Sequence, residues 1–342
     1  MTAVRMNAVS VDYGNGRVLD SVDLDVDHGS TVAVLGPSGS GKSSLLGAIA
    51  GLVPVVEGEI YLSGTRVTGS GVSVGPEGRG VAMVFQDFSL WPHLSVLDTV
   101  AYPIRMSGVD RAGARSSARR FLELFGIAGL ADRFPDALSG GQQQRVGLAR
   151  AMARNAGVML FDEPTAHLDV PLRSALAEEI RAVLSERGAA AVLATHDAAE
   201  ALATSDRIVL LREGRVVQAG SPVEVYERPV DEWAARLTGL ASLITGVVSA
   251  GEGVARVKVD GAEESVIAEG VMGGSRAVVR PEWVKIGGPL PGRVSAVSYR
   301  GGFSDHQLET SVGDVTVRAL GPPMVRAGDR VGWRLDRVWL IR

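Results

Sequence analysis

Alternating apolar and polar residues mark the first clear element of the chain. Every second residue of Val22–Asp27 is hydrophobic, which is the period-two pattern of a strand that buries one face. A continuous aliphatic run follows at Thr31–Leu35. After it come a glycine-rich loop and then apolar residues at helical spacing, at Leu45, Leu46, Ile49 and Leu52. We therefore expect an antiparallel β-layer followed by a buried strand, a loop and a helix.

Two further short apolar runs predict buried strands, at Val158–Phe161 and Ala191–Ala194. A helical stretch separates them, as the connection between parallel strands requires. This helix has clear ends, because Asp169 can cap it, Pro171 falls in its first turn and Gly188 follows its last turn. The alternation of strands and helices predicts a parallel α/β sheet.

The middle of the chain is helical without strands. Between about Ser95 and Asp136, one face of the pattern carries Ala118, Phe121, Leu122 and Phe125. We interpret this region as a helical subdomain inserted at about residues 95–155. Ser221–Glu224 then has the sequence of a capping box, with proline at the first helical position, and predicts one more helix.

The last third of the chain has a different character. From about Leu243, short Val-rich runs alternate with Gly and Pro turns, as in Gly292–Val297 and Gly313–Val317. This pattern is typical of a small all-β domain of barrel type. We therefore expect two domains, with residues 1–238 in the first and residues 239–342 in the second.

Composition narrows the class of protein. A chain of 342 residues that is 46% hydrophobic can bury a sizeable core. The net charge of −4 lacks the basic footprint of a nucleic-acid-binding protein. With no cysteine, the sequence excludes disulfides and thiolate sites. We see neither a signal peptide nor an apolar run of about 18–20 residues, so we expect any membrane role to depend on a partner.

A phosphate-binding loop follows the Thr31–Leu35 strand. The residues Gly36-Pro37-Ser38-Gly39-Ser40-Gly41-Lys42-Ser43 match G-x-x-x-x-G-K-[ST] between a predicted strand and a predicted helix. Glycines let the backbone N–H groups point at phosphate oxygens, and the helix N-terminus adds partial positive charge. We expect Lys42 to reach the β- and γ-phosphates, Ser43 to bind Mg²⁺, and Ser44 to contact the nucleotide. A ligand-free Gly/Ser turn is the alternative, but the strand–helix context argues against it.

Two carboxylates end the Val158–Phe161 strand. Asp162 and Glu163 would lie at the carboxyl edge of the sheet, where ligands bind in open α/β folds. Asp162 can hold Mg²⁺ through its water shell, and Glu163 can polarise the water that attacks the γ-phosphate. A solvated acidic turn is the alternative, and the phosphate loop upstream makes it the weaker one.

The pentapeptide Leu138-Ser139-Gly140-Gly141-Gln142 lies in order between these two motifs. With it, the chain resembles ABC transporter ATPases. The resemblance implies a P-loop NTPase fold with a RecA-like core, an antiparallel β subdomain and a helical subdomain. It also implies that Ser139, Gly140, Gly141 and Gln142 cap the γ-phosphate of ATP bound by a second copy of the chain.

Four further residues match the family's smaller motifs. Tyr13 resembles the aromatic that stacks on adenine, although a Tyr before Gly is also common in turns. Gln86 resembles the Q-loop glutamine, which touches Mg²⁺ and the attacking water. Asp169 resembles the D-loop aspartate, although Ala166 and His167 depart from the motif. His196 resembles the switch histidine that contacts the γ-phosphate; a satisfied polar residue at a strand end is the alternative.

The β-rich tail resembles the TOBE-type regulatory domain, with an OB-like barrel, of binding-protein-dependent importers. The segment from Val84 to Val96, with its Trp91-Pro92-His93, is similar to the ferric-iron subgroup. Polyamine, phosphonate, sulfate and sugar importers are close alternatives. The resemblance implies ATP and Mg²⁺ as cofactors, a homodimer, two transmembrane permease subunits and, indirectly, an extracytoplasmic solute-binding protein. It also implies a peripheral location at the cytoplasmic face of the membrane.

Two other classes of function remain open. One is a soluble ABC ATPase that acts on DNA or ribosomes, although the chain has neither a long coiled coil between the Walker motifs nor a second cassette. The other is a regulatory module in which ATP acts as a signal for the C-terminal β-domain. The net charge argues against nucleic acid as a partner.

Overall fold

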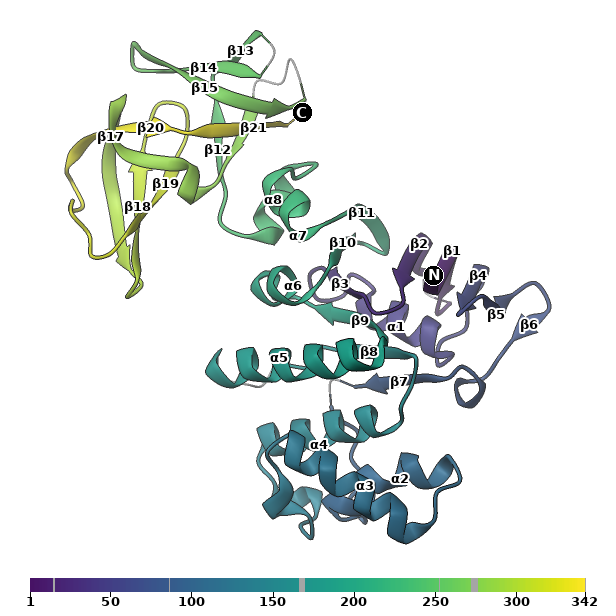
Figure 1. Ribbon diagram of the computed structural model, residues 1–342. Coiled ribbons are helices and arrows are strands. Elements are labelled where there is room, and N and C mark those ends of the chain that lie inside the picture. The colour runs from purple at the N-terminus through teal and green to yellow at the C-terminus, as the bar shows by residue number, and fades with distance from the viewer. Residues whose placement is uncertain (15, 86, 166–169, 252, 272–275, 342) are drawn as a thin grey trace. The chain divides into compact units, whose positions relative to one another are not determined.

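The computed structural model describes residues 1–14, 16–85, 87–165, 170–251, 253–271 and 276–341 (Figure 1). Its contacts divide the chain into two compact units, Met1–Pro222 and Val223–Arg342. Each unit has a hydrophobic core of its own. Within the described residues, no helix combines the length and the hydropathy that a bilayer span requires.

An antiparallel sheet forms the first layer of the first unit. Its strands pair in the order β2-β1-β4-β5-β6, with the bounds β1 Thr2–Asp12, β2 Arg17–Asp27, β4 Glu57–Leu62, β5 Thr65–Gly69 and β6 Val72–Ser73. In β2, Val22, Leu24 and Val26 are buried while the aspartates between them are exposed. The predicted alternation is therefore confirmed.

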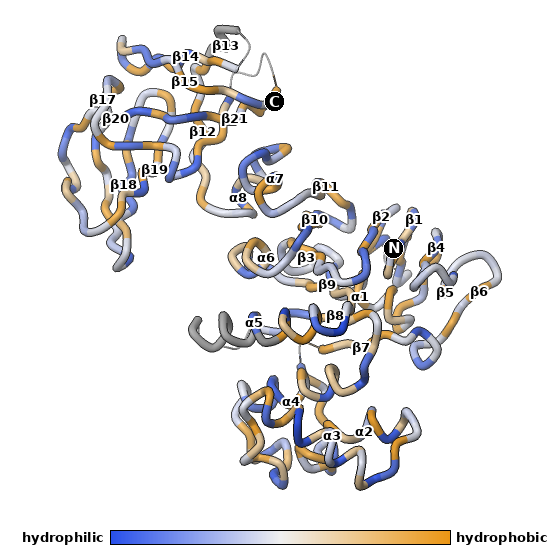
Figure 2. Tube along the Cα trace, in the orientation of Figure 1, coloured by the Kyte–Doolittle hydropathy of each residue, from blue (hydrophilic) through white to orange (hydrophobic). Residues whose placement is uncertain are grey.

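A second sheet of the first unit has the strand order β11-β10-β3-β9-β8-β7. Its bounds are β3 Thr31–Leu35, β7 Val81–Val84, β8 Val158–Asp162, β9 Ala190–Thr195, β10 Arg207–Arg212 and β11 Arg215–Gly220. The pairs from β7 to β10 are parallel, and β11 is an antiparallel edge strand. Figure 2 shows mainly hydrophobic positions along β7 and β9, as strands covered on both faces require.

Helices connect the strands of this sheet. They are α1 Lys42–Ala50, the short turn η1 Pro76–Gly78, α5 Val170–Arg187 and α6 Ala198–Thr204. The helix after the phosphate loop was expected to include Leu52, but it ends at Ala50. Gly51 ends it by adopting the left-handed conformation, with φ 78°, and Leu52 is exposed.

The predicted helical insert is present. It consists of α2 Val96–Met106, α3 Arg111–Leu124, η2 Ala128–Leu130, η3 Pro135–Ala137 and α4 Gly140–Ala153. Ser95 and Asp110 cap α2 and α3 with their side-chain oxygens. The face of α3 that the pattern identified is buried at Ala118 and Leu122, with Phe125 directly after the helix.

The second unit is mainly β-structure. Its helices are α7 Pro222–Glu227, which begins one residue before the unit, α8 Glu232–Thr238 and the turn η4 Pro281–Trp283. One sheet has the order β12-β16-β21-β15-β14-β13 and the other the order β19-β18-β17-β20. The bounds are β12 Ser242–Thr245, β13 Val247–Gly251, β14 Val254–Val259, β15 Ala262–Gly270, β16 Arg276–Val279, β17 Val284–Tyr299, β18 Phe303–Glu309, β19 Val315–Leu320, β20 Arg330–Leu335 and β21 Arg337–Ile341. Both sheets contribute to one apolar core, in which Trp333 is fully buried.

Arg280 joins the helical segment before the barrel to the barrel itself. Its guanidinium is fully buried and donates hydrogen bonds to the carbonyl oxygens of Tyr226, Ala235 and Leu240 and to the Thr238 hydroxyl. It also lies 4.0 Å from the centre of the Tyr226 ring. These contacts explain why α8 and most of α7 group with the second unit, although the predicted boundary at residues 238/239 placed them in the first domain.

Replacing Arg280 should weaken the second unit strongly. Arg280→Met leaves several buried carbonyl oxygens without a donor, so we expect a loss of about 3 kcal/mol in the free energy of unfolding. Arg276→Met is the matched control, because Arg276 makes an exposed ion pair with Glu232 at 2.6 Å. It should cost under about 1 kcal/mol.

Urea unfolding of the full chain, followed by tryptophan fluorescence, measures both variants. Four of the five tryptophans lie in the second unit, at residues 233, 283, 333 and 339, so the signal reports mainly on that unit. Equal losses for the two variants would show that Arg280 does not hold these helices.

Candidate nucleotide-binding site

The phosphate loop occupies the turn between β3 and α1. Gly41 adopts a φ of 104° at the helix start, and a Cβ there would come within 2.7 Å of the Val18 carbonyl oxygen. A Cβ on Gly36 would come within 2.4 Å of the Leu211 carbonyl oxygen. Both positions therefore require glycine, as the sequence motif does. The N-terminus of α1 opens directly from this loop, so its free N–H groups are available to an anion.

Lys42 is a buried cation inside the loop. Its side chain is 5% exposed, and its Nζ donates to the carbonyl oxygens of Gly36 and Pro37, both at 2.9 Å. Glu163 Oε1 lies 3.9 Å from the same nitrogen. Burial lowers the pKa of Lys42, while the nearby carboxylates of Glu163 and Asp162 raise it. Neutral carbonyl groups are weaker partners for an ammonium than an anion is, so the site favours a phosphate at this point.

The carboxylates Asp162 and Glu163 lie where the sequence placed them, at the carboxyl end of β8. Asp162 is buried, and burial raises the pKa of its carboxyl, while a hydrogen bond with Ser43 lowers it. One carboxylate oxygen, Asp162 Oδ1, is buried and has no hydrogen-bond partner among the described residues. A buried anionic oxygen of this kind needs a cation or a donor beyond those that the described residues supply.

Glu163 and His196 come together at the ends of two neighbouring strands. His196 Nδ1 lies 3.0 Å from Glu163 Oε1, and β9, which precedes His196, is paired with β8 in parallel. Glu163 has a φ of 48°, an uncommon conformation for a residue with a side chain. Its N–H donates to the Ala194 carbonyl oxygen at 2.9 Å, which holds that conformation. Lys42, Glu163 and His196 thus meet at the carboxyl ends of β3, β8 and β9.

Tyr13 lies beside the end of the phosphate loop. Its ring is 54% exposed, and its hydroxyl is 3.2 Å from Ser44 Oγ, so it stands beside the start of α1. An exposed aromatic face next to the loop is suited to stacking on a base.

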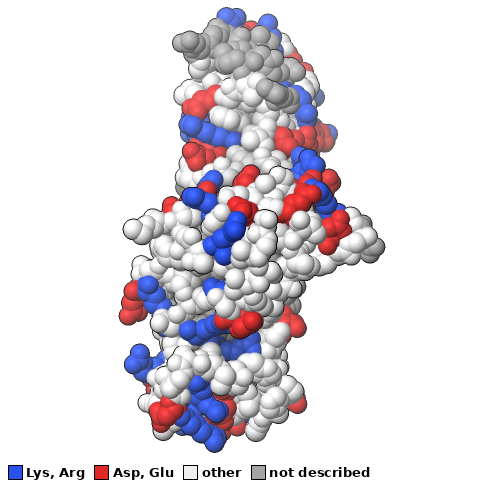
Figure 3. All heavy atoms as spheres, turned by 90° about the vertical axis from the view of Figure 1, so that its right-hand side faces the viewer, with Lys and Arg blue, Asp and Glu red and all other residues white. Residues whose placement is uncertain are grey.

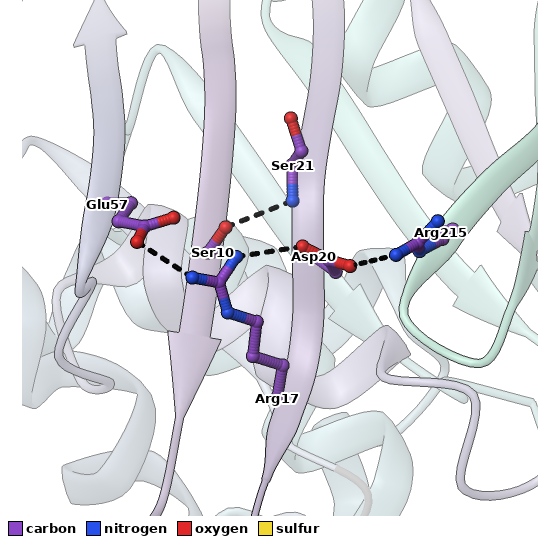
Figure 4. A network of polar contacts seen from close by, with 6 residues as sticks. All are labelled: Ser10, Arg17, Asp20, Ser21, Glu57 and Arg215. Carbon is purple, nitrogen blue, oxygen red and sulfur yellow. Dashed lines mark hydrogen bonds and ion pairs between the residues drawn. The ribbon is translucent and has the colours of Figure 1, made fainter.

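A polar network fixes the strand that follows Tyr13 (Figure 4). Arg17, at the start of β2, donates to Asp20 at 2.9 Å and to Glu57 of β4 at 2.7 Å. Asp20 also pairs with Arg215 of β11. The backbone supports the same link, because Gly214 accepts from the Asp20 N–H and donates to the Ser40 carbonyl oxygen at 3.0 Å. The network therefore connects the antiparallel layer to the phosphate loop.

The motif Ser139–Gln142 begins α4. Ser139 caps the helix, and Gln142 returns a hydrogen bond to the Ser139 N–H, so the two residues form a complete capping box. Ser139 and Gly140 are exposed to solvent. Ser139, Gly141 and Gln142 line a hollow that does not include the phosphate loop. Its other lining residues are Gly126, Ile127, Gly129, Leu130 and Arg145. The exposed helix end is thus free to meet an anion brought by another molecule.

Two of the predicted site residues, Gln86 and Asp169, lie outside the described residues, as do the neighbouring Ala166 and His167. Sequence analysis also missed Glu200, a buried carboxylate hydrogen-bonded to Thr165 and Thr195. Its place in the first turn of α6 gave no signal of this contact, because an acid there is usually taken as a partner of the helix dipole.

Comparisons with known proteins agree with this geometry. The model of the ABC transporter family matches residues 19–166, and that of the TOBE domain matches residues 277–341. The Fe(3+) ions import ATP-binding protein FbpC of Agrobacterium fabrum is 40% identical over 311 residues, which is 89% of this chain and 87% of that protein. The protein of the same name from Streptomyces avermitilis is 44% identical over 247 residues, covering 72% of this chain and 70% of that one.

Solved structures show the same fold. A dimeric ATP-binding cassette in a post-hydrolysis state, bound to ADP and Pi, has a TM-score of 0.60 at 31% identity, covering 64% of this chain and 98% of that chain. Another, cbiO1 of Clostridium perfringens, is described as part of an ABC transporter complex. It has a TM-score of 0.58 at 27% identity, covering 66% of this chain and 90% of that chain. The predicted P-loop fold with a TOBE-type β-domain is confirmed. On the matched domains, the full-length relatives and the assembled phosphate loop, the chain belongs to the ABC transporter family of ATPases, as an ATP-binding subunit of the importer type.

Proposed function

We propose that Glu163 is the general base with which this subunit hydrolyses ATP, and that two copies of the chain share two nucleotides to drive import of a solute. The observation that carries the proposal is the meeting of Lys42, Glu163 and His196 at three neighbouring strand ends, with Glu163 Oε1 within 3.9 Å of Lys42 Nζ and 3.0 Å of His196 Nδ1. A base, a cation and a polar hydrogen-bonding group within this distance can hold a γ-phosphate and the water that attacks it.

The loop binds the triphosphate in this scheme. Residues Gly36 to Ser44 present N–H groups, and Lys42 exchanges the carbonyl oxygens of Gly36 and Pro37 for phosphate oxygens. Tyr13 stacks on the adenine. Because the ammonium is already buried and aimed, little reorganisation is needed when the nucleotide binds.

The residues around Asp162 fit Mg²⁺. The ion prefers oxygen ligands and keeps several waters. The Ser43 hydroxyl and the buried, unpartnered Asp162 Oδ1 supply oxygens of this kind side by side. Bound there with ATP, the ion would neutralise charge on the phosphates. Gln86, outside the described residues, completes the metal environment in this proposal.

Catalysis requires that Glu163 accept a proton from water. Its carboxylate is held by the backbone bond to Ala194 and by His196, whose imidazole then contacts the γ-phosphate. Asp169 contributes to the same site across the subunit boundary in this proposal.

Dimerisation follows from the exposed end of α4. Within Ser139–Gln142, the capping box uses the N–H groups of Ser139 and Gln142 and leaves those of Gly140 and Gly141 to an anion. The related cassette with ADP and Pi is described as dimeric. ATP therefore stabilises the paired state, because its γ-phosphate completes the helix end of the second copy.

The docking site for the permease is a groove with a mainly apolar lining. It lies between the second sheet and the helical insert and includes Phe85, Trp91, Tyr102 and Met106. The Trp91 and Tyr102 rings are 4.8 Å apart, and the Arg150 guanidinium lies 5.1 Å from the Trp91 ring. A short permease helix with apolar residues fits this groove. Such docking places the chain at the cytoplasmic face of the membrane.

Ferric iron is the proposed cargo, since relatives that match most of the chain are named as Fe(3+) import proteins. A relative from Rhizobium johnstonii, 40% identical over 71% of this chain, is instead named for sn-glycerol-3-phosphate import, so that solute is the second candidate. Action on nucleic acid has less support: on the face in Figure 3, basic and acidic residues are interspersed.

Glu163→Gln should abolish turnover while nucleotide binding persists. The amide keeps the shape of the side chain but cannot accept the proton, so we expect kcat to fall by about 10²-fold or more. Phosphate release measures the rate, and equilibrium titration with ATP measures the affinity. Turnover within about twofold of the parent chain would rule out Glu163 as the base.

Lys42→Ala should impair binding itself. The variant removes the cation that faces the β- and γ-phosphates, so we expect the Kd for ATP to rise by about tenfold or more. Lys258→Ala, which removes an exposed lysine of the β-domain, is the control and should leave the Kd unchanged. An unchanged Kd in Lys42→Ala would place the triphosphate elsewhere.

Transport assays identify the cargo. Proteoliposomes that contain this chain, its permease and its solute-binding protein should accumulate radioactive Fe³⁺ when ATP is inside. The same vesicles with Glu163→Gln should not. Accumulation of sn-glycerol-3-phosphate without Fe³⁺ would replace iron by the second candidate.

A further inference from the structure

A buried carboxylate lies behind the two catalytic strand ends. Glu200, in the first turn of α6, is 8% exposed. One oxygen, Oε1, accepts a hydrogen bond from the Thr165 hydroxyl, and the other, Oε2, accepts one from the Thr195 hydroxyl at 2.5 Å. Both threonines are buried. Hydrogen bonds to an ionised acceptor in a buried setting are shorter and stronger than those between neutral groups.

The two threonines belong to the segments that carry the proposed catalytic residues. Thr165 follows Glu163 by two residues, after β8. Thr195 is the last residue of β9 and directly precedes His196. Its hydroxyl also accepts the N–H of Asp197 at 3.0 Å, so it fixes the backbone on the far side of His196 as well. Glu200 therefore joins the two segments with one oxygen for each.

Other contacts hold Glu200 itself in place. Asp197 caps α6 by accepting the N–H groups of Ala199 and Glu200, at 2.9 and 3.3 Å. The helix thus begins two residues after His196, and its first turn aims the carboxylate at the sheet. The left-handed backbone of Glu163, with φ 48°, needs surroundings of this rigidity to persist.

We propose that Glu200 is a positioning residue for hydrolysis: it holds the Glu163 and His196 segments in a fixed relation by bridging Thr165 and Thr195. This inference rests on the roles proposed above for Glu163 and His196. A displacement of about 1 Å at a catalytic group can cost about 10²-fold in rate, so a link between these two segments has a direct kinetic consequence.

Glu200→Ala should lower kcat by about ten- to a hundredfold, with the Kd for ATP measured without Mg²⁺ changed by less than about threefold. Glu200→Gln should recover most of the rate, because its carbonyl oxygen still accepts from one threonine and its amide can donate to the other. Thr204→Val is the matched control: its hydroxyl donates to the main-chain oxygen of Glu200 at 2.7 Å, not to the carboxylate. It should keep the rate within about twofold.

A double-mutant cycle separates positioning from a general structural role. If Glu200 acts through His196, adding Glu200→Ala to His196→Ala should cost less than about threefold in the single-turnover rate. Multiplication of the two single losses would show that Glu200 does not act by positioning His196 relative to Glu163, and would overturn the inference. Full turnover in both Glu163→Gln and His196→Ala would instead overturn the proposed function.

A measurement on the nucleotide-free protein provides a second readout. The Glu163 N–H donates to Ala194, so its hydrogen exchange reports whether the two strand ends stay together. Exchange should be faster in Glu200→Ala than in Thr204→Val; equal rates would contradict the proposal. If Glu200→Ala does not fold, Thr165→Val, which removes one of the two links, takes its place in both experiments with the same expected direction.

Discussion

A buried ammonium group that lacks a strong anionic partner is the interaction on which this site depends. Lys42 is 5% exposed, yet its close contacts are two carbonyl oxygens, and the nearest carboxylate oxygen is 3.9 Å away. Burial disfavours its charged form and lowers its pKa. In the proposed function, the oxygens of a triphosphate replace these carbonyl oxygens and favour the charged form of Lys42. Nucleotide binding is therefore coupled to the contacts that Lys42 makes within the phosphate loop.

Asp162 is the acidic counterpart of Lys42. Burial raises the pKa of Asp162, and one of its oxygens has no partner. In the proposed function, Mg²⁺ bound with ATP would supply the cation for the acid, and the triphosphate would supply the anion for the lysine. Glu163 follows Asp162 in the chain and lies close to Lys42 and His196. The groups proposed for catalysis therefore surround the buried acid and the buried lysine that MgATP would pair. In the proposed dimer, the exposed end of α4 offers N–H groups to the phosphate bound by the second chain.

The local motifs were predictable because they depend on short stretches of chain. Gly36–Ser43, the strand before it and the acids after Phe161 follow from residue type and spacing, and parallel pairing brings such strand ends to one edge. Glu200 and Arg280 were not predictable in this way. Glu200 meets Thr165 through the packing of α6 on the sheet, and Arg280 reaches four residues that lie 40 to 54 positions earlier. Sequence spacing carries no signal for contacts that tertiary packing creates. The early end of α1 has a different cause: Gly51 is a local helix-stop signal, and it outweighed the apolar spacing that extended to Leu52.

Sedimentation velocity of the Glu163→Gln chain tests most directly whether one phosphate group is bound by two copies of the protein. Without nucleotide, the chain should sediment at the mass of the 35.8 kDa monomer. With saturating MgATP, it should sediment at twice that mass, and changing Ser139 and Gly141 to bulky residues should remove the effect while ATP still binds. A chain that stays monomeric with ATP bound would contradict a shared site.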